Sequence, residues 1–115
     1  MPSRRTQKSI DAYKKVRDTA SEQTYSFFSD APAITEYKYW RLLKNNFPYD
    51  AIASKHYLLT PRRVFTYDSE MTSPEREELY IIKRQLAKTF DSILENFTQR
   101  RTIKEHFHLH LLNFK

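Results

Sequence analysis

The sequence contains no glycine, and this absence constrains the fold more than any other single feature. Glycine ordinarily supplies the positive φ of tight turns and lets the backbone approach a phosphate closely. Every turn must therefore be built from asparagine, aspartate, serine or proline. The absence also argues against the glycine-rich phosphate loops of Walker-type and Rossmann-type nucleotide sites.

Size and charge limit the possible functions further. The 115 residues suffice for one domain with a single core, since 39% are hydrophobic and 15% are aromatic. The absence of cysteine excludes disulfides, thiolate nucleophiles and thiolate metal sites. No signal-like segment and no run of ~18 apolar residues is present, so we expect a cytoplasmic protein without a membrane partner. The net charge of +6 favours anionic partners, either phosphorylated small molecules or nucleic acid.

Apolar spacing and turn residues predict an α+β fold, with helices on one face of an antiparallel sheet. The predicted strands are Tyr37–Leu43, His56–Leu59 and Thr102–Phe114. A serine cap at Ser73, followed by Pro74 in the first turn, predicts a long helix that reaches Asn96.

The N-terminal third is expected to be an extension of the folded domain. Its first residues are basic, and a short amphipathic helix is predicted from the helical spacing of Ile10, Tyr13, Val16 and Ala20. Residues 21–32 are read as a connection. The expected division is therefore an extension over residues 1–33 and a folded domain over residues 34–115.

Three of the four histidines alternate with apolar residues in the segment His106–Leu112. Side chains of a strand point alternately to opposite faces, so His106, His108 and His110 would share one face with neighbouring rings ~6.6 Å apart. The intervening apolar side chains would pack against the long helix.

Three interpretations of this histidine row remain open on the residues alone. The row can be the solvated face of an amphipathic strand. It can hold a metal ion, although the nearest carboxylate, Glu105, would point to the opposite face. It can also perform covalent chemistry, because a neutral imidazole is a good nucleophile near pH 7 when neighbours fix its tautomer and manage the leaving group.

The segment His106–Leu112 resembles the His-φ-His-φ-His-φ-φ motif, with φ an apolar residue, that names the histidine-triad superfamily of nucleotide hydrolases and transferases. The segment His56–Arg63 is similar to that family's strand of the type Gly-His-x-Leu-Val-x-Pro-Lys/Arg, and Asn46–Asp50 resembles the loop before it. The resemblance covers Ile34–Phe114. It implies a histidine-triad-like fold, with an antiparallel sheet and one long helix beside the short N-terminal helix.

The resemblance also implies roles for individual residues. His108 would be the nucleophile that takes the α-phosphate, His106 would orient its ring, and His110 would contact phosphate and leaving-group oxygens. The substrate-binding residues that it implies are His56, Asn46, Asn96 and Thr102. Turn formation and helix capping remain alternative roles for the two asparagines.

The function implied is hydrolysis of a purine nucleotide at its α-phosphate, without a cofactor. The third triad position is His110 and not the glutamine of the transferase branches, which favours water as the acceptor. The bond would be a phosphoric anhydride, as in a dinucleoside polyphosphate, or a phosphoramidate. The alternatives are nucleotidyl transfer, a non-catalytic interaction protein, and processing or binding of nucleic-acid ends. The basic charge allows a nucleic-acid partner but does not favour it.

Two expectations about metal and assembly rest on the same resemblance. Many members hold zinc through Cys-x-x-Cys, but the matching stretch here is Ser26-Phe27-Phe28-Ser29, and serine hydroxyls are poor zinc ligands. We therefore expect a metal-free protein. Members usually pair into a continuous sheet, so we expect a two-fold homodimer, and a monomer in light scattering at high micromolar concentration would contradict this.

Overall fold

A computed structural model describes residues 4–8, 10–11, 31–46, 48–98 and 105–115. All strand pairs are antiparallel, and they form one five-stranded sheet in the order β1-β2-β3-β5-β4. The strands are β1 Thr35–Glu36, β2 Trp40–Lys44, β3 Ala53–Pro61, β4 Ser92–Leu94 and β5 Leu109–Phe114. The short 3-10 helix η2 is Asp68–Glu70 and the main helix α3 is Ser73–Leu86. The predicted α+β class, an antiparallel sheet with one main helix, is therefore confirmed.

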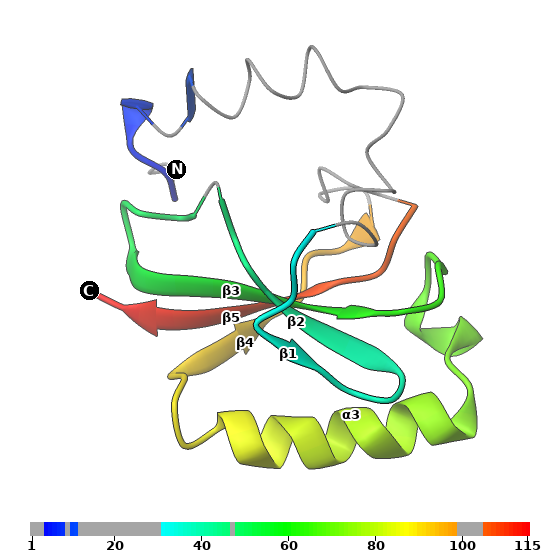
Figure 1. Cartoon of the computed structure of the whole chain (residues 1–115). Coiled ribbons are helices and arrows are strands. Elements are labelled where there is room, and N and C mark those ends of the chain that lie inside the picture. Colours follow the sequence, from blue (N-terminus) through cyan, green and yellow to red (C-terminus); the bar gives the residue numbers. More distant parts are fainter. Residues whose placement is uncertain (1–3, 9, 12–30, 47, 99–104) are drawn as a thin grey trace.

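The two faces of the sheet have different neighbours. Helix α3 lies along one face, and the described N-terminal residues lie on the other side of the sheet (Figure 1). Most of the predicted N-terminal helix and of the connection that follows it lies outside the described residues. No helix in the described part of the chain is long and apolar enough to cross a membrane.

The core lies between the sheet and α3, as the sequence predicts. Phe107, Leu109 and Leu111 pack in one cluster with Leu79 and Ile82 of the helix. The indole N–H of Trp40 in β2 donates to the backbone carbonyl of Glu75, at 2.8 Å. This buried bond ties the sheet to the first turn of α3.

Helix α3 is capped by Thr72 and not by the predicted Ser73. The Thr72 hydroxyl accepts a hydrogen bond from the Glu75 backbone N–H, and the Glu75 carboxylate accepts one from the Thr72 backbone N–H. This reciprocal capping box satisfies two amides that the helix leaves unpaired. Ser73 is the first helical residue instead.

The prediction of a helix to Asn96 is wrong beyond Leu86. The chain turns there, and β4 pairs with the edge of β5, from Ser92 opposite Leu112 to Leu94 opposite His110. The apolar spacing that suggested a longer helix included Phe90. This residue is buried in the core as predicted, but it reaches the core from the turn that follows the helix. Strand pairing prevails because it satisfies backbone groups along β5 that would otherwise lie at an open edge.

The described turns are built without glycine. None of the described residues has a positive φ. Between β2 and β3, the backbone carbonyl of Tyr49 accepts from the N–H groups of Ile52 and Ala53. The polar residues Asn45 and Asp50 flank this turn, in agreement with the expected use of asparagine and aspartate.

Candidate functional site

Strand register brings two histidines together on the sheet face opposite α3. His110 of β5 pairs with Leu58 of β3, and His56 lies two residues before Leu58, so the histidines are diagonal neighbours on one face. Nε2 of His56 lies 2.7 Å from Nδ1 of His110, and the ring centroids are 5.0 Å apart. Both side chains are buried.

His106 and His108 precede β5, so the predicted strand from Thr102 is wrong over these residues. Nε2 of His106 donates to the carbonyl of Pro61 at the end of β3, at 3.0 Å. The backbone carbonyl of His106 accepts from Nδ1 of His108, at 2.9 Å. The irregular backbone places the ring centroids of His108 and His110 5.1 Å apart, closer than the ~6.6 Å of a regular strand.

Burial decides against one interpretation of the histidine row. All three triad histidines are at most 6% exposed, so they are not the solvated face of a strand. In the ranges that the structure describes, no group of three or more histidine, aspartate and glutamate side chains is arranged to hold a metal ion.

Hydrogen bonds to backbone groups fix the tautomers of these rings. A peptide N–H only donates, so the bond from the Tyr49 N–H at 2.9 Å makes Nδ1 of His56 an acceptor. In neutral rings, Nε2 of His56 then donates to Nδ1 of His110, and the proton of His110 lies on Nε2. A carbonyl only accepts, so Nδ1 of His108 carries a proton and its lone pair lies on Nε2.

Burial keeps the two paired rings neutral. Desolvation, followed by the charge of Arg5 and by that of His108 when His108 is protonated, lowers the pKa of His56 from 6.5 to about 4. Desolvation also lowers the pKa of His110, with smaller contributions from His108, His56 and the arginines Arg4 and Arg5. Both imidazoles are therefore uncharged at neutral pH, as the tautomer chain requires.

We expect the folded protein to lose stability as the pH falls from 7 to 5. Unfolded histidine binds a proton below a pH of about 6.5, whereas folded His56 stays neutral until the pH nears 4, so acid favours the unfolded state. The loss from His56 alone amounts to about 2 kcal/mol at pH 5. Urea unfolding at the two pH values measures it.

The variant His56→Asn provides the control for this prediction. Asparagine keeps a hydrogen-bonding side chain but does not titrate, so its free energy of unfolding should fall less between pH 7 and pH 5. The same fall in both proteins would show that His56 is not the group responsible.

Three polar or aromatic side chains surround the paired histidines. The Asn45 amide nitrogen lies 3.3 Å from each ring nitrogen of His56. The Tyr49 ring stacks on His110 with a centroid distance of 5.1 Å, and it lies 4.4 Å from the His56 ring. The Asn96 amide nitrogen lies 3.3 Å from Nε2 of His110.

The structure brings together four of the residues that the sequence singled out, namely His56, His108, His110 and Asn96. Asn46 is exposed, and its neighbour Asn45 contacts His56 instead, because the Asn45 backbone N–H pairs with the His56 carbonyl. Side chains alternate along β2, and Leu43 lies on the same face as the histidines. The residue two positions later, Asn45, is therefore expected on that face as well. Thr102, Ser26 and Ser29 lie outside the described residues.

Tyr49 and the N-terminal arginines were not recognised in the sequence as site residues. The aromatic ring of the Asn-Phe-Pro-Tyr-Asp turn was an available signal for Tyr49. Nothing in the local pattern of Arg4 and Arg5 points to the histidines, because only the tertiary structure brings the two ends of the chain together.

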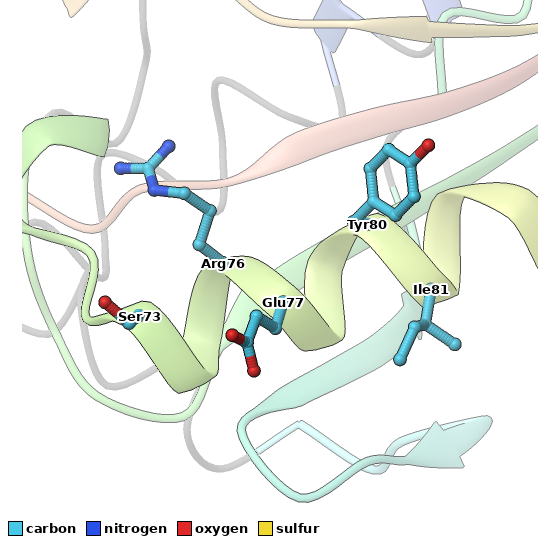
Figure 2. A pocket seen from close by; sticks show the side chains of 5 residues that line it. All are labelled: Ser73, Arg76, Glu77, Tyr80 and Ile81. Atoms are coloured by element: carbon cyan, nitrogen blue, oxygen red, sulfur yellow. The ribbon is translucent and has the colours of Figure 1, made fainter.

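A hollow of about 600 Å³ lies elsewhere, along the exposed side of α3. Figure 2 shows the side chains that line it, all from this helix: Ser73, Arg76, Glu77, Tyr80 and Ile81. None of them is a histidine, and α3 lies across the sheet from His56 and His110. The candidate functional site is therefore the histidine cluster and not this hollow.

No protein-family profile and no curated protein matches the sequence. Solved structures do match the fold. A histidine triad protein from Clostridium difficile is similar with a TM-score of 0.57 and 17% identity, over 77% of this chain and 87% of that chain. A HIT family hydrolase from Legionella pneumophila Philadelphia 1 is similar with a TM-score of 0.54 and 21% identity, over 73% and 83%. The protein HTC1 is similar with a TM-score of 0.57 and 15% identity, over 96% and 75%.

Proposed function

We propose that this chain, which has the fold of the histidine-triad proteins, hydrolyses a nucleotide at its α-phosphate through covalent catalysis by His108. One observation carries the proposal: hydrogen bonds leave the lone pair of His108 on Nε2 and the proton of His110 on Nε2, on rings 5.1 Å apart. A nucleophile and a hydrogen-bond donor thus lie on neighbouring rings, and attack on a phosphate can use both.

In the first step, Nε2 of His108 forms a bond to phosphorus, and the leaving group departs with the electron pair of the broken P–O or P–N bond. An amine leaving group takes up a proton from solvent as this bond breaks, and a phosphate leaving group departs as the anion. The ring of His108 then carries a positive charge, which its Nδ1–H shares with the carbonyl of His106. In the second step, water attacks the phosphorus and the P–N bond breaks. The electron pair returns to Nε2, the water proton passes to solvent, and nucleoside monophosphate is released.

His110 and Asn96 provide two donors for one phosphate oxygen. Arg4 donates to Oδ1 of Asn96, at 3.1 Å, which turns the amide nitrogen of Asn96 towards His110. Nε2–H of His110 and this amide nitrogen, which also donates to the Tyr49 hydroxyl at 3.4 Å, are both donors and lie 3.3 Å apart. A phosphate oxygen that accepts hydrogen bonds from both groups gains negative charge in the transition state, and the two donors would stabilise that charge.

A turnover panel tests the proposed function. We expect the wild-type protein to release nucleoside monophosphate from adenosine or guanosine phosphoramidates, from dinucleoside polyphosphates, or from both. In water enriched in ¹⁸O, the label should appear in the monophosphate and not in the leaving group, because water attacks the α-phosphorus. Absence of turnover across the panel, or label in the leaving group, would contradict the proposal.

The net charge of +6 allows the alternative of nucleic-acid end processing but does not favour it over small nucleotides. Binding to DNA ends with a steep salt dependence, together with no turnover of small nucleotides, would favour it.

A further inference from the structure

The N-terminal residues Arg4, Arg5 and Thr6 are attached to the turn between β2 and β3. The backbone N–H and the hydroxyl of Thr6 donate to the two carboxylate oxygens of Asp50, at 2.7 and 2.9 Å. The Arg4 carbonyl accepts from the N–H of Ala51, at 2.9 Å. These contacts hold the segment on the side of the sheet away from α3 (Figure 1). His56 and His110 lie on the same side, because Leu109 and Leu111 point towards α3 and the histidines alternate with them in the strand register.

This attachment places two guanidinium groups beside the histidine cluster. The Cζ atoms of Arg4 and Arg5 lie 5.2 and 4.8 Å from the centroid of the Tyr49 ring. The same ring stacks on His110. Arg4 also donates to Asn96, whose amide faces His110. A chain of contacts therefore runs from His108 through His110 and Tyr49 to the two arginines.

The electrostatic effect of this segment reaches the reacting groups. Positive charge on Arg4 and Arg5 contributes to the lowered pKa of His110, and Arg5 does the same for His56. Charges that disfavour protons on these rings attract anions to the same place. Guanidinium groups match phosphate in shape as well as charge, because their N–H donors pair with phosphate oxygens.

We propose that Arg4 and Arg5 form an anion-recognition pair that selects substrates by the phosphate charge of their leaving group. The inference rests on the proposed function. In an in-line displacement the leaving group departs on the side of phosphorus away from the nucleophile. Along the chain of contacts that starts at His108, the two arginines come after His110 and Tyr49. A leaving group that extends past His110 and has phosphates of its own would therefore reach them, whereas an amine is too short and lacks the phosphate charge to gain from them.

The test compares two adenosine substrates that differ in the charge of the leaving group. Diadenosine tetraphosphate releases ATP when it is cleaved at its α-phosphate, and adenosine phosphoramidate releases ammonia. In the variant Arg4→Ala/Arg5→Ala, the ratio of kcat/KM for the first substrate to that for the second should fall about 10-fold or more. An unchanged ratio, with both values lowered equally or not at all, would overturn the proposal.

Two further variants sharpen this comparison. Lys83→Ala/Arg84→Ala removes the same charge from the exposed side of α3, and the ratio should stay within about twofold of wild type. Arg4→Lys/Arg5→Lys keeps the charge and should recover part of the ratio. A control variant that lowered the ratio as much as the alanine pair would mean that net charge, and not this segment, selects the substrate.

A binding measurement separates failure of this inference from failure of the proposed function. If the wild-type protein cleaves neither substrate, calorimetry with ATP and with adenosine replaces turnover. The alanine pair should then weaken ATP binding about 10-fold or more and leave adenosine binding unchanged. Equal ATP affinity in both proteins would overturn the anion-recognition pair whatever the reaction is.

Discussion

Replacement of His108 by alanine should lower kcat more than ~100-fold and leave the fold intact, since general acid–base assistance alone is typically worth ~10²–10⁴. The variant loses the Nε2 lone pair that forms the bond to phosphorus. The fold survives because the neighbouring side chains of Phe107 and Leu109, 1% and 2% exposed, provide the packing of this segment. Steady-state turnover and circular dichroism of the two proteins measure both expectations.

Direct detection of the intermediate complements the kinetic result. Wild-type enzyme quenched during turnover should carry an acid-labile nucleotidyl group on the peptide that contains His108, which mass spectrometry detects. Tyr80→Ala, in the hollow on α3 (Figure 2), is the matched control and should retain full turnover. A His108→Ala variant that keeps more than about a hundredth of the wild-type kcat would rule out covalent catalysis at this residue.

Replacement of Phe107 by alanine should lower the free energy of unfolding by about 3–5 kcal/mol. The ring is 1% exposed and lies between Trp40, at a centroid distance of 6.3 Å, and Phe65, at 5.6 Å. Two costs follow from its removal: the favourable free energy of burying the ring is lost, and a cavity remains between the sheet and α3. Urea unfolding measures the change.

Phe97 offers a matched control for this substitution, because its side chain is 81% exposed. Phe97→Ala should change the free energy of unfolding by no more than about 0.5 kcal/mol. If Phe107→Ala fails to fold, Phe107→Leu should still fold, and its loss in the free energy of unfolding should be smaller than that of the alanine variant. Similar losses at positions 97 and 107 would show that Phe107 is not a core residue.

Much of the fold follows from local features of the sequence. Apolar residues at positions 107, 109 and 111 alternate as in a strand, and Leu79 and Ile82 follow a helical period, so each segment already indicates which side it buries. The absence of glycine indicated turns built from polar residues, and Asn45 and Asp50 flank the turn between β2 and β3. These features are local, because side-chain periodicity reflects the geometry of one segment alone.

The end of α3 was decided by the tertiary structure. Phe90 and Ile93 continue the apolar spacing of the helix, and the residues between them contain no proline or glycine that would end it. What ends it is the pairing of Ser92–Leu94 with β5, a partner that lies far along the chain. Periodicity reports that a residue is buried, and it does not report whether a neighbouring strand offers backbone partners.

The candidate site divides in the same way. The alternating histidines and the resemblance of their motif identified His106, His108 and His110, and the segment around His56, from the sequence alone. Strand register, by contrast, brings His56 to His110 across 54 residues and selects Asn45 in place of Asn46.

Folding also brings Arg4 to Asn96 across 92 residues. The neutral state of the paired imidazoles depends on the tertiary structure as well, because desolvation, the largest cause of their lowered pKa, acts only once the surrounding strands exclude water. The sequence thus determined which chemical groups are present on which segments. Only tertiary contacts decided their partners, their tautomers and their charge, because these depend on residues that are distant along the chain.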